Sequence, residues 1–218
     1  GEEGGCGGSL ITPRHVLTAA HCVHFYMKPT KITINYGSAK GTGGKKMPVK
    51  GYYYHKNFNI KTGQNDIALL LLSEPVKVSP QSRPICLPES KPKIVGTTVT
   101  VAGWGHTKEN NRSASPILMS TDQVVWTSEM CIETFPDFNM ETQICAQKNF
   151  TGPCKGDSGG PLMTLTGRNF EVIGIVSYSK SKIDCGWQGA PQVYTSVWHF
   201  VPWIKEAISS DENYMKPE

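Results

Sequence analysis

Residues 67–72 read IALLLL, the longest wholly apolar run in a chain of 218 residues. A run of this length is far too short to cross a bilayer. Other short runs are rich in β-branched residues and bounded by turn signals; they are VLTAA (16–20), KITINYG (31–37), VTVAGW (99–104) and VIGIVSY (172–178). With 22 glycines and 15 prolines the chain also turns often. Short strands between frequent turns are typical of a sandwich or barrel, so we predict an all-β fold.

A Pro- and Lys-rich stretch, CLPESKPK at 86–93, separates two sets of strand-like runs. It divides the chain into an N-terminal half, residues 1–92, and a C-terminal half, residues 93–218. The last clear element is VWHFVPWIKEAISS at 197–210, whose apolar positions recur at helical spacing. Since proline suits the first turn of a helix, we predict a C-terminal helix that starts one residue before Pro202 and packs on the C-terminal half.

The net charge of +4 is unevenly spread, because no acidic residue lies between Glu3 and Asp66. The lysines in that interval form either a basic surface for an acidic polysaccharide or acidic protein, or simply a solvated face. Aromatic residues interleaved with this basic stretch, in the way that proteins stack on bases, are limited to YYYH at 52–55, which argues against a nucleic-acid partner.

Seven cysteines in a chain of this size indicate an oxidising compartment. The alternative is a metal site at HCVH, residues 21–24, but no matching ligand pair follows at zinc-finger spacing. We therefore expect neither a metal nor a cofactor. Two N-glycosylation sequons, at Asn111 and Asn149, agree with secretion. An odd number of cysteines leaves at least one thiol free or paired outside the chain.

The stretch TGPCKGDSGGPL at 151–162 places Ser158 among glycines. A serine hydroxyl becomes a nucleophile only when a base takes its proton and a third group orients that base. His21, in LTAAHC, and Asp66, in NDIALLLL, are the candidate base and orienting carboxylate. The amides of Gly156 and Ser158 are candidates for binding a developing oxyanion. Each feature alone has a structural alternative, such as a core histidine or a turn aspartate, and the order His–Asp–Ser makes the set specific.

Five motifs, between residues 6 and 208, resemble those of the trypsin/chymotrypsin family of serine proteases; they are TAAHC (18–22), NDIALL (65–70), AGWG (102–105), GDSGGPL (156–162) and VYTSV (193–197). The resemblance implies two packed antiparallel β-barrels and a C-terminal α-helix. It implies His21 as general base and then general acid, Asp66 as the carboxylate that orients it, and Ser158 as the nucleophile. The amides of Gly156 and Ser158 would form the oxyanion hole. Ser177 matches the family residue that supports this triad and begins the strand that pairs with substrate.

The resemblance also implies how the cysteines pair: Cys6 with Cys22, Cys131 with Cys145, and Cys154 with Cys185. Cys86 is left over. It occupies a position where two-chain family members tether an N-terminal pro-region, which suggests a longer zymogen; a free thiol is the alternative.

The specificity pocket departs from the family pattern. Gly152 stands where trypsin-like members have an aspartate, so a substrate Lys or Arg would lose its counter-charge at a cost of several kcal/mol. Ser179 and Gln192 match wall positions that are small in open pockets, and Gln192 is expected to shorten the pocket. Tyr178 replaces the usual Trp, and Lys155 adds positive charge at the rim. We expect a shallow polar pocket for small uncharged side chains, tolerant of acidic ones; the alternative is a pocket too occluded to bind well.

Activated family members pair an N-terminal ammonium with the aspartate before the nucleophile, here Asp157. This chain begins GEE, which resembles the residues just after that terminus, and soon reaches Cys6. The five residues before Cys6 span at most about 17 Å. We therefore expect the first barrel to lack a strand and Asp157 to lack this partner.

Together these features predict a secreted, extracellular serine endopeptidase that forms an acyl-enzyme and cleaves after small uncharged residues rather than after Lys or Arg. Its expected partners are protein substrates and protein protease inhibitors, and no membrane span is expected. The rival is a catalytically impaired homologue that binds or regulates within an extracellular proteolytic cascade. The intact His–Asp–Ser set favours the enzyme, whereas the filled pocket and the missing N-terminus favour the rival.

Overall fold

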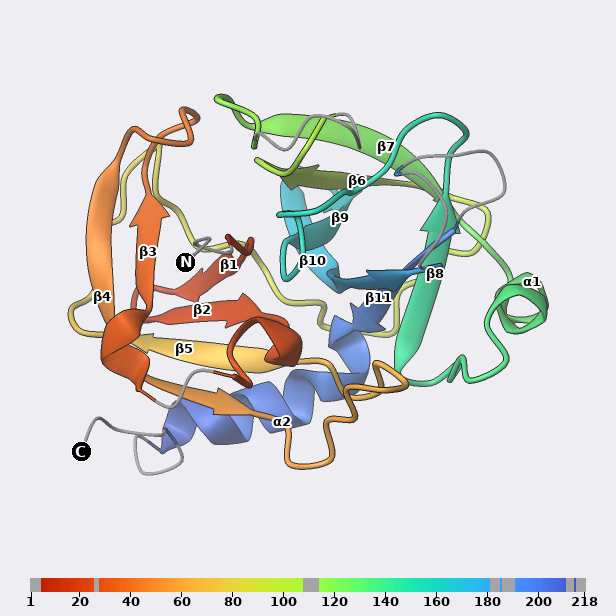
Figure 1. Ribbon diagram of the computed structural model, residues 1–218, viewed down its shortest axis with the longest axis horizontal. Helices are drawn as coiled ribbons and strands as arrows, with labels where there is room; N and C mark the ends of the chain where they lie inside the picture. Colours follow the sequence, from red (N-terminus) through yellow and green to blue (C-terminus); the bar gives the residue numbers. More distant parts are fainter. Residues whose placement is uncertain are drawn as a thin grey trace.

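Two antiparallel β-structures and a long helix make up the protein (Figure 1). The computed structural model describes residues 5–25, 28–107, 114–180, 185, 191–210 and 214. The first β-structure is an open sheet with strand order β1-β2-β5-β4-β3. Its strands are β1 (Ser9–Thr12), β2 (His15–Thr18), β3 (Thr33–Tyr36), β4 (Lys45–Tyr54) and β5 (Ala68–Leu72).

The second β-structure is a closed barrel with strand order β10-β11-β8-β7-β6-β9. Its strands are β6 (Thr98–Gly103), β7 (Met119–Val125), β8 (Gln143–Gln147), β9 (Pro161–Thr166), β10 (Asn169–Ser179) and β11 (Gln192–Ser196). Two α-helices accompany it, α1 (Ser128–Thr134) and α2 (Val197–Ser209), while the 3-10 turns η1 (Ala20–Cys22) and η2 (Pro29–Lys31) belong to the first half.

The predicted fold class is confirmed, including the incomplete first barrel. The structure is mostly β, and its six-stranded barrel, curled open sheet and C-terminal helix are arranged as in the chymotrypsin fold (Figure 1). Within the described residues, β1 and β3 end the first sheet without pairing to each other. Each therefore leaves one strand edge free of sheet hydrogen bonds.

The run IALLLL forms the centre of the first sheet because both faces of β5 are covered. Leu69 and Leu71 face a core that also contains residues of the second barrel and of α2. Leu70 and Leu72 face a separate core within the first sheet. Successive side chains of a strand point to opposite faces, so a strand buried on both sides reads as a continuous apolar run. All five residues of β5 are accordingly buried.

Of two expectations about the C-terminal helix, the start was wrong and the packing was incomplete. Helix α2 begins at Val197 and contains Pro202 in its interior, where proline removes a backbone hydrogen bond. Burial of Val197 and Phe200 in the shared core accompanies the earlier start. The helix also packs on both halves of the chain: Trp203 stacks on Tyr53 of β4 with ring centroids 5.3 Å apart, and α2 crosses beneath β5 (Figure 1).

No helix within the described residues is both long enough and apolar enough to cross a membrane.

Candidate active site

Asp66 is buried two residues before β5, the strand that is covered on both faces. Its Oδ2 accepts hydrogen bonds from His21 Nδ1 at 2.7 Å and from Ser177 Oγ at 2.5 Å. Its Oδ1 accepts one from the His21 backbone N–H at 2.9 Å. An ionised carboxylate only accepts hydrogen bonds, so the proton of the imidazole lies on Nδ1. Nε2 then keeps a lone pair with which to take a proton from another group.

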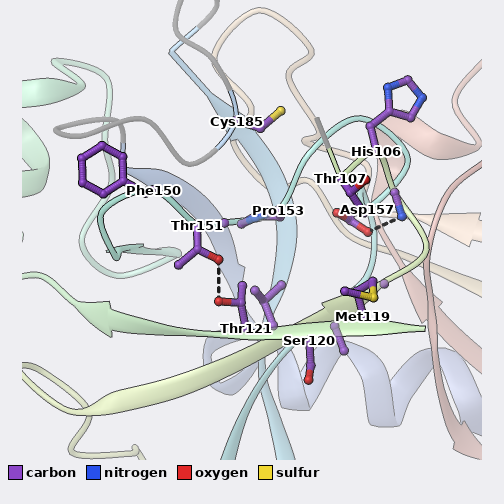
Figure 2. A pocket seen from close by; sticks show the side chains of 15 residues that line it. His106, Thr107, Met119, Ser120, Thr121, Phe150, Thr151, Pro153, Asp157 and Cys185 are labelled. Carbon is purple, nitrogen blue, oxygen red and sulfur yellow. Dashed lines mark hydrogen bonds between the residues drawn. The ribbon is translucent and has the colours of Figure 1, made fainter. Parts of the chain in front are cut away.

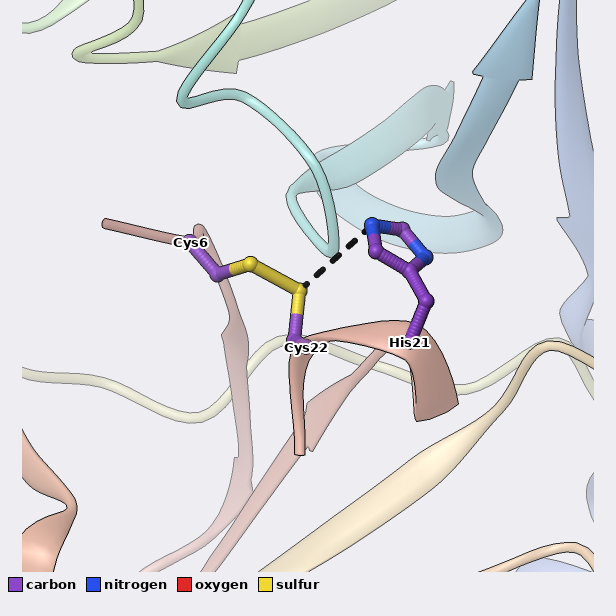
Figure 3. Close-up of side chains that lie close together, drawn as sticks. All are labelled: Cys6, His21 and Cys22. Atoms are coloured by element: carbon purple, nitrogen blue, oxygen red, sulfur yellow. Dashed lines mark hydrogen bonds between the residues drawn. A yellow bond between two sulfur atoms is a disulfide. The ribbon is translucent and has the colours of Figure 1, made fainter. Parts of the chain in front are cut away.

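His21 lies in η1, and the Cys6–Cys22 disulfide holds the next residue (Figure 3). The Cys22 sulfur is 3.8 Å from His21 Nε2 and 3.7 Å from the carbonyl oxygen of Ser158. Cys6, His21 and Cys22 bring three potential metal-ligand atoms within 4.8 Å of one another. Metals bind the thiolate, and here the two sulfurs are bonded to each other. These two sulfurs are therefore not thiolate ligands for a metal.

Ser158 sits in a turn that glycines make possible. Gly156 has a φ of +95° and Gly159 one of +78°, conformations that favour glycine. A Cβ at Gly159 would also overlap the hydroxyl of Thr18. The Gly7 N–H donates to the Ser158 carbonyl oxygen at 2.7 Å, which ties this turn to the segment leading into β1.

Two backbone donors in this turn have no acceptor among the described residues: the N–H groups of Gly156 and Ser158. Their neighbours are paired, since Asp157 N–H donates to Cys154 and Gly159 N–H to Val176. Unpaired amides beside a serine are suited to stabilise a negative oxygen. Ser158 Oγ itself makes no hydrogen bond to a described residue, and such bonds often form only when substrate is bound.

Asp157 is a second buried carboxylate, 9% exposed. It accepts hydrogen bonds from the backbone N–H of Gly105 at 2.8 Å and of Cys154 at 2.9 Å. It borders a cavity of about 210 Å³ with polar and apolar walls; Figure 2 places Asp157 and Phe150 at opposite sides of it. No described lysine, arginine or histidine lies within ion-pair distance of this carboxylate.

The structure brings together only some of the residues that are predicted to line the specificity pocket. Ser179 and Gln192 are opposite each other in the β10–β11 pair, and Gln192 is 7% exposed. Tyr178 is half-buried, and burial raises its pKa above the ordinary value. Gly152 lines the cavity beside Asp157, whereas the Lys155 side chain is exposed. Residues 186–190, which lead into Gln192, lie outside the described residues, so the depth of the pocket stays a prediction.

Three disulfides form in the structure, in the pairs that the family resemblance implies: Cys6–Cys22, Cys131–Cys145 and Cys154–Cys185. The Cys86 thiol is exposed and makes no disulfide with a described residue. Of the two sequons, Asn149 is exposed next to Phe150, a non-glycine residue with a φ of +65°. Asn111 lies outside the described residues.

Sequence reasoning missed two residues that hold the segment carrying Asp66. The hydroxyl of Thr195, in β11, donates to the Asp66 carbonyl oxygen at 2.8 Å. The amide of Gln143, in β8, donates to the Gly63 carbonyl oxygen at 3.3 Å. The available signal was a polar side chain in a buried strand, but a sequence does not say what such a side chain meets across the fold.

Comparison with known proteins agrees with this geometry. The family model described as Trypsin matches residues 1–204. The chain is 34% identical over 207 residues to Transmembrane protease serine 11G of Rattus norvegicus, which covers 92% of this chain and 48% of that protein. It is 36% identical over 221 residues to Proclotting enzyme of Tachypleus tridentatus, covering 92% of this chain and 58% of that protein.

The chain belongs to the trypsin family, and its class is that of the serine proteases. It spans about half the length of these two relatives.

Proposed function

We propose that this chain acts as a serine endopeptidase that hydrolyses proteins through an acyl-enzyme. The observation that carries the proposal is the 2.7 Å hydrogen bond from His21 Nδ1 to Asp66, beside the turn that holds Ser158. This bond leaves His21 Nε2 free to act as a base towards Ser158. The residues on either side of the 92/93 boundary then work as one peptidase domain, because His21 and Asp66 come from the first half and Ser158 from the second.

In the first step Ser158 Oγ attacks the substrate carbonyl carbon while His21 Nε2 takes the hydroxyl proton. The charge that develops on the carbonyl oxygen is stabilised by the N–H groups of Gly156 and Ser158. When the carbon–nitrogen bond breaks, His21 returns the proton to the leaving amine. Water repeats the same steps on the ester and releases the acid, which restores Ser158.

For the substrate, we propose small uncharged side chains before the scissile bond. Gly152 supplies no carboxylate for a substrate Lys or Arg, and a buried cation without a partner is strongly disfavoured. The buried Gln192 supports a short pocket. Digestion of a peptide library and mass spectrometry of the products tests this: cleavage concentrated after Lys or Arg would contradict it.

We propose further that Asp157 receives an N-terminal ammonium and that this pairing activates the enzyme. The carboxylate is buried, borders a cavity and has only backbone partners among the described residues. A protonated amine in that cavity would hold Asp157, and with it the Ser158 turn, in place. The exposed Cys86 is the proposed attachment point of a pro-region, as expected for a protease stored as a zymogen.

An extracellular setting is the proposed location. Three disulfides are typical of oxidising compartments, and exposed Asn149 is the proposed glycosylation site. Protein protease inhibitors are the proposed partners besides substrates, since they bind where substrates bind.

The second candidate function is that of an impaired homologue that binds or regulates within a proteolytic cascade. Its support is that Ser158 Oγ makes no hydrogen bond to a described residue and that no described cation meets Asp157.

A fluorophosphonate probe followed by intact-mass measurement separates the two functions. The chain and its Ser158→Ala variant are treated alone, with a short apolar dipeptide bearing a free ammonium, and with the same dipeptide acetylated. An enzyme gains the mass of one probe, the variant gains none, and only the free dipeptide accelerates labelling. A folded chain that stays unlabelled in all three conditions is the impaired homologue.

A further inference from the structure

The segment from Gly63 to Asp66 is tied to its own loop, where the Gly63 N–H donates to the Asn59 carbonyl oxygen at 2.8 Å, and it also has an unusual backbone conformation. Gly63 has a φ of +66° and Asn65 one of +56°, so two of its residues are left-handed. Asparagine tolerates this conformation better than most residues, but at some cost. Asn65 donates a hydrogen bond to Asn57 within the same loop. A strained segment persists only when the surrounding structure fixes it, and this one ends at the carboxylate bonded to His21.

Beyond its own loop, the segment is held by the second barrel through two residues directly opposite each other. Thr195 of β11 pairs with Gln143 of β8, so both side chains project from the same face of the barrel. Thr195 Oγ donates to the Asp66 carbonyl oxygen at 2.8 Å. Gln143 Nε2 donates to the Gly63 carbonyl oxygen at 3.3 Å. The pair therefore holds the two ends of the Gly63–Asp66 segment.

Both members of the pair are themselves fixed. Thr195 is 1% exposed and Gln143 is 4% exposed. Gln143 Oε1 accepts a hydrogen bond from the Asn139 backbone N–H at 2.9 Å, which sets the direction of the amide group. The same amide lies 3.4 Å from the hydroxyl of Tyr178, the residue that replaces the usual Trp. A Trp indole carries no oxygen that could accept this bond, so the contact depends on the Tyr.

The ring of Tyr178 packs closely against Gly63. A Cβ at Gly63 would lie 2.5 Å from two ring carbons of Tyr178. The segment is thus enclosed by the Tyr178 ring on one side and by the two hydrogen bonds from β8 and β11, and a shift of its backbone would move the carboxylate bonded to His21.

We propose that Thr195 and Gln143 are positioning residues for the reaction: from the second barrel they hold the Gly63–Asp66 segment so that the Asp66 carboxylate meets His21 Nδ1. Neither residue touches the reacting atoms; both act through Asp66. The proposal rests on the proposed endopeptidase function for its kinetic readout, and a spectroscopic readout makes it independent of activity.

The test compares the same substitution at two threonines, Thr195 in β11 and Thr142 in the turn just before β8. Thr195→Val removes the hydroxyl that holds Asp66. Thr142→Val is the matched control, because the buried Thr142 hydroxyl has no hydrogen-bond partner among the described residues. Thr195→Ser keeps a hydroxyl at the same place. Gln143→Met removes the amide at similar volume.

The spectroscopic readout is the low-field NMR resonance of the His21 Nδ1 proton, recorded on the full chain. We expect Thr195→Val to shift this resonance or lose it to exchange, whereas Thr142→Val and Thr195→Ser keep it. A smaller shift is expected for Gln143→Met, because its bond to the segment is longer. If Thr195→Val leaves the resonance where Thr142→Val leaves it, the proposal is wrong.

The kinetic readout is kcat and KM, measured separately. We expect Thr195→Val to lower kcat by roughly 10- to 100-fold, since misplacement of a catalytic group by about 1 Å can cost 100-fold. KM stays within about twofold, because no group that binds substrate is removed. Thr195→Ser restores most of kcat. A purely structural role would lower thermal stability but leave both the resonance and kcat of the folded protein unchanged, which would overturn the proposal.

Failure of the proposed function looks different. A chain that has no activity and takes up no probe, but whose resonance still responds to Thr195→Val and not to Thr142→Val, has the positioning pair without catalysis. If Thr195→Val does not fold, the other two variants decide. The proposal is contradicted if the His21 Nδ1 proton resonance stays in place in Gln143→Met and is lost in Thr195→Ser.

Discussion

Two buried aspartates flank the reacting groups, and their surroundings differ in kind. Asp66 accepts hydrogen bonds from an imidazole, a hydroxyl and a backbone amide. Asp157 accepts hydrogen bonds from two backbone amides and borders a cavity of about 210 Å³. The partner of Asp66 that can carry positive charge, His21, is therefore supplied by the fold itself, and none is supplied to Asp157 by the described residues.

The two aspartates therefore differ in whether the described residues alone supply all of their partners. Burying a carboxylate is costly unless donors or a cation compensate. Around Asp66 the compensation is complete within the two β-structures, so that region is assembled whenever the chain folds. Around Asp157 the amides compensate only in part, and a cation that enters the cavity would complete the arrangement. The Ser158 turn follows Asp157 directly, so the proposed activation would act on this region.

The largest expected effect is a loss of kcat when the negative charge of Asp66 is removed. Asp66→Asn would present an amide to His21 and favour the wrong tautomer of the imidazole. We expect kcat to fall by about 10⁴-fold, the order found for the same change in the reference protease of this family. Circular dichroism checks that the fold is kept, and a loss of less than tenfold would mean that Asp66 does not orient the base.

The next largest effect is expected on the stability of the fold, when the space beside Asp157 is filled. A Cβ at Gly103 would overlap Asp157 Oδ1, so Gly103→Ala forces the carboxylate out of its place. We expect the free energy of unfolding to drop by about 3 kcal/mol, the upper end for overpacking a tight site. Urea denaturation measures it. Gly5→Ala is the matched control, because a Cβ there meets nothing within 4 Å.

A milder test changes the chemistry of Asp157 and keeps its shape. In Asp157→Asn the new NH₂ group must face one of the two amides of Gly105 and Cys154, which then lacks an acceptor. An unsatisfied buried donor costs about 1–2 kcal/mol, which urea denaturation resolves. The variant should also lose acceleration of probe labelling by the free dipeptide. Retained acceleration would show that the amine does not act through this carboxylate.

The smallest expected effect is a pH dependence of stability that comes from His55, outside the surroundings of both aspartates. His55 contacts Phe200 and Trp203 of α2, and burial, followed by Lys56 and His199, lowers its pKa below 6.5. As the pH falls through about 6.5, the unfolded chain binds this proton before the folded one does. Stability from this residue is thus present above 6.5 and lost below it.

We expect His55→Gln to flatten the fall in melting temperature between about pH 6.5 and pH 5. Melting curves at several pH values check this. A variant whose curve falls as steeply as that of the original chain would mean that other groups cause the loss.

The fold was readable from the sequence wherever one strand or one motif carried the signal. IALLLL predicted a buried strand because burial on both faces demands an unbroken apolar run. Short strands and frequent turns predicted the all-β class, and the motif resemblance led to the chymotrypsin arrangement. The helix start was misplaced because Pro202 was taken as a local signal, whereas burial of Val197 and Phe200 in a core shared by both halves accompanies the earlier start.

The same division holds for the candidate site. By itself the sequence identified the candidates for the reacting residues, since His21, Asp66 and Ser158 are recognisable from their local motifs. Only the tertiary structure decided what surrounds them: that Thr195 and Gln143 hold the segment of Asp66, and that Asp157 borders a cavity. The physical reason is that hydrogen bonds between the two halves join residues far apart in the sequence, 129 positions for Thr195 and Asp66, and no local pattern records which polar group a buried side chain will meet.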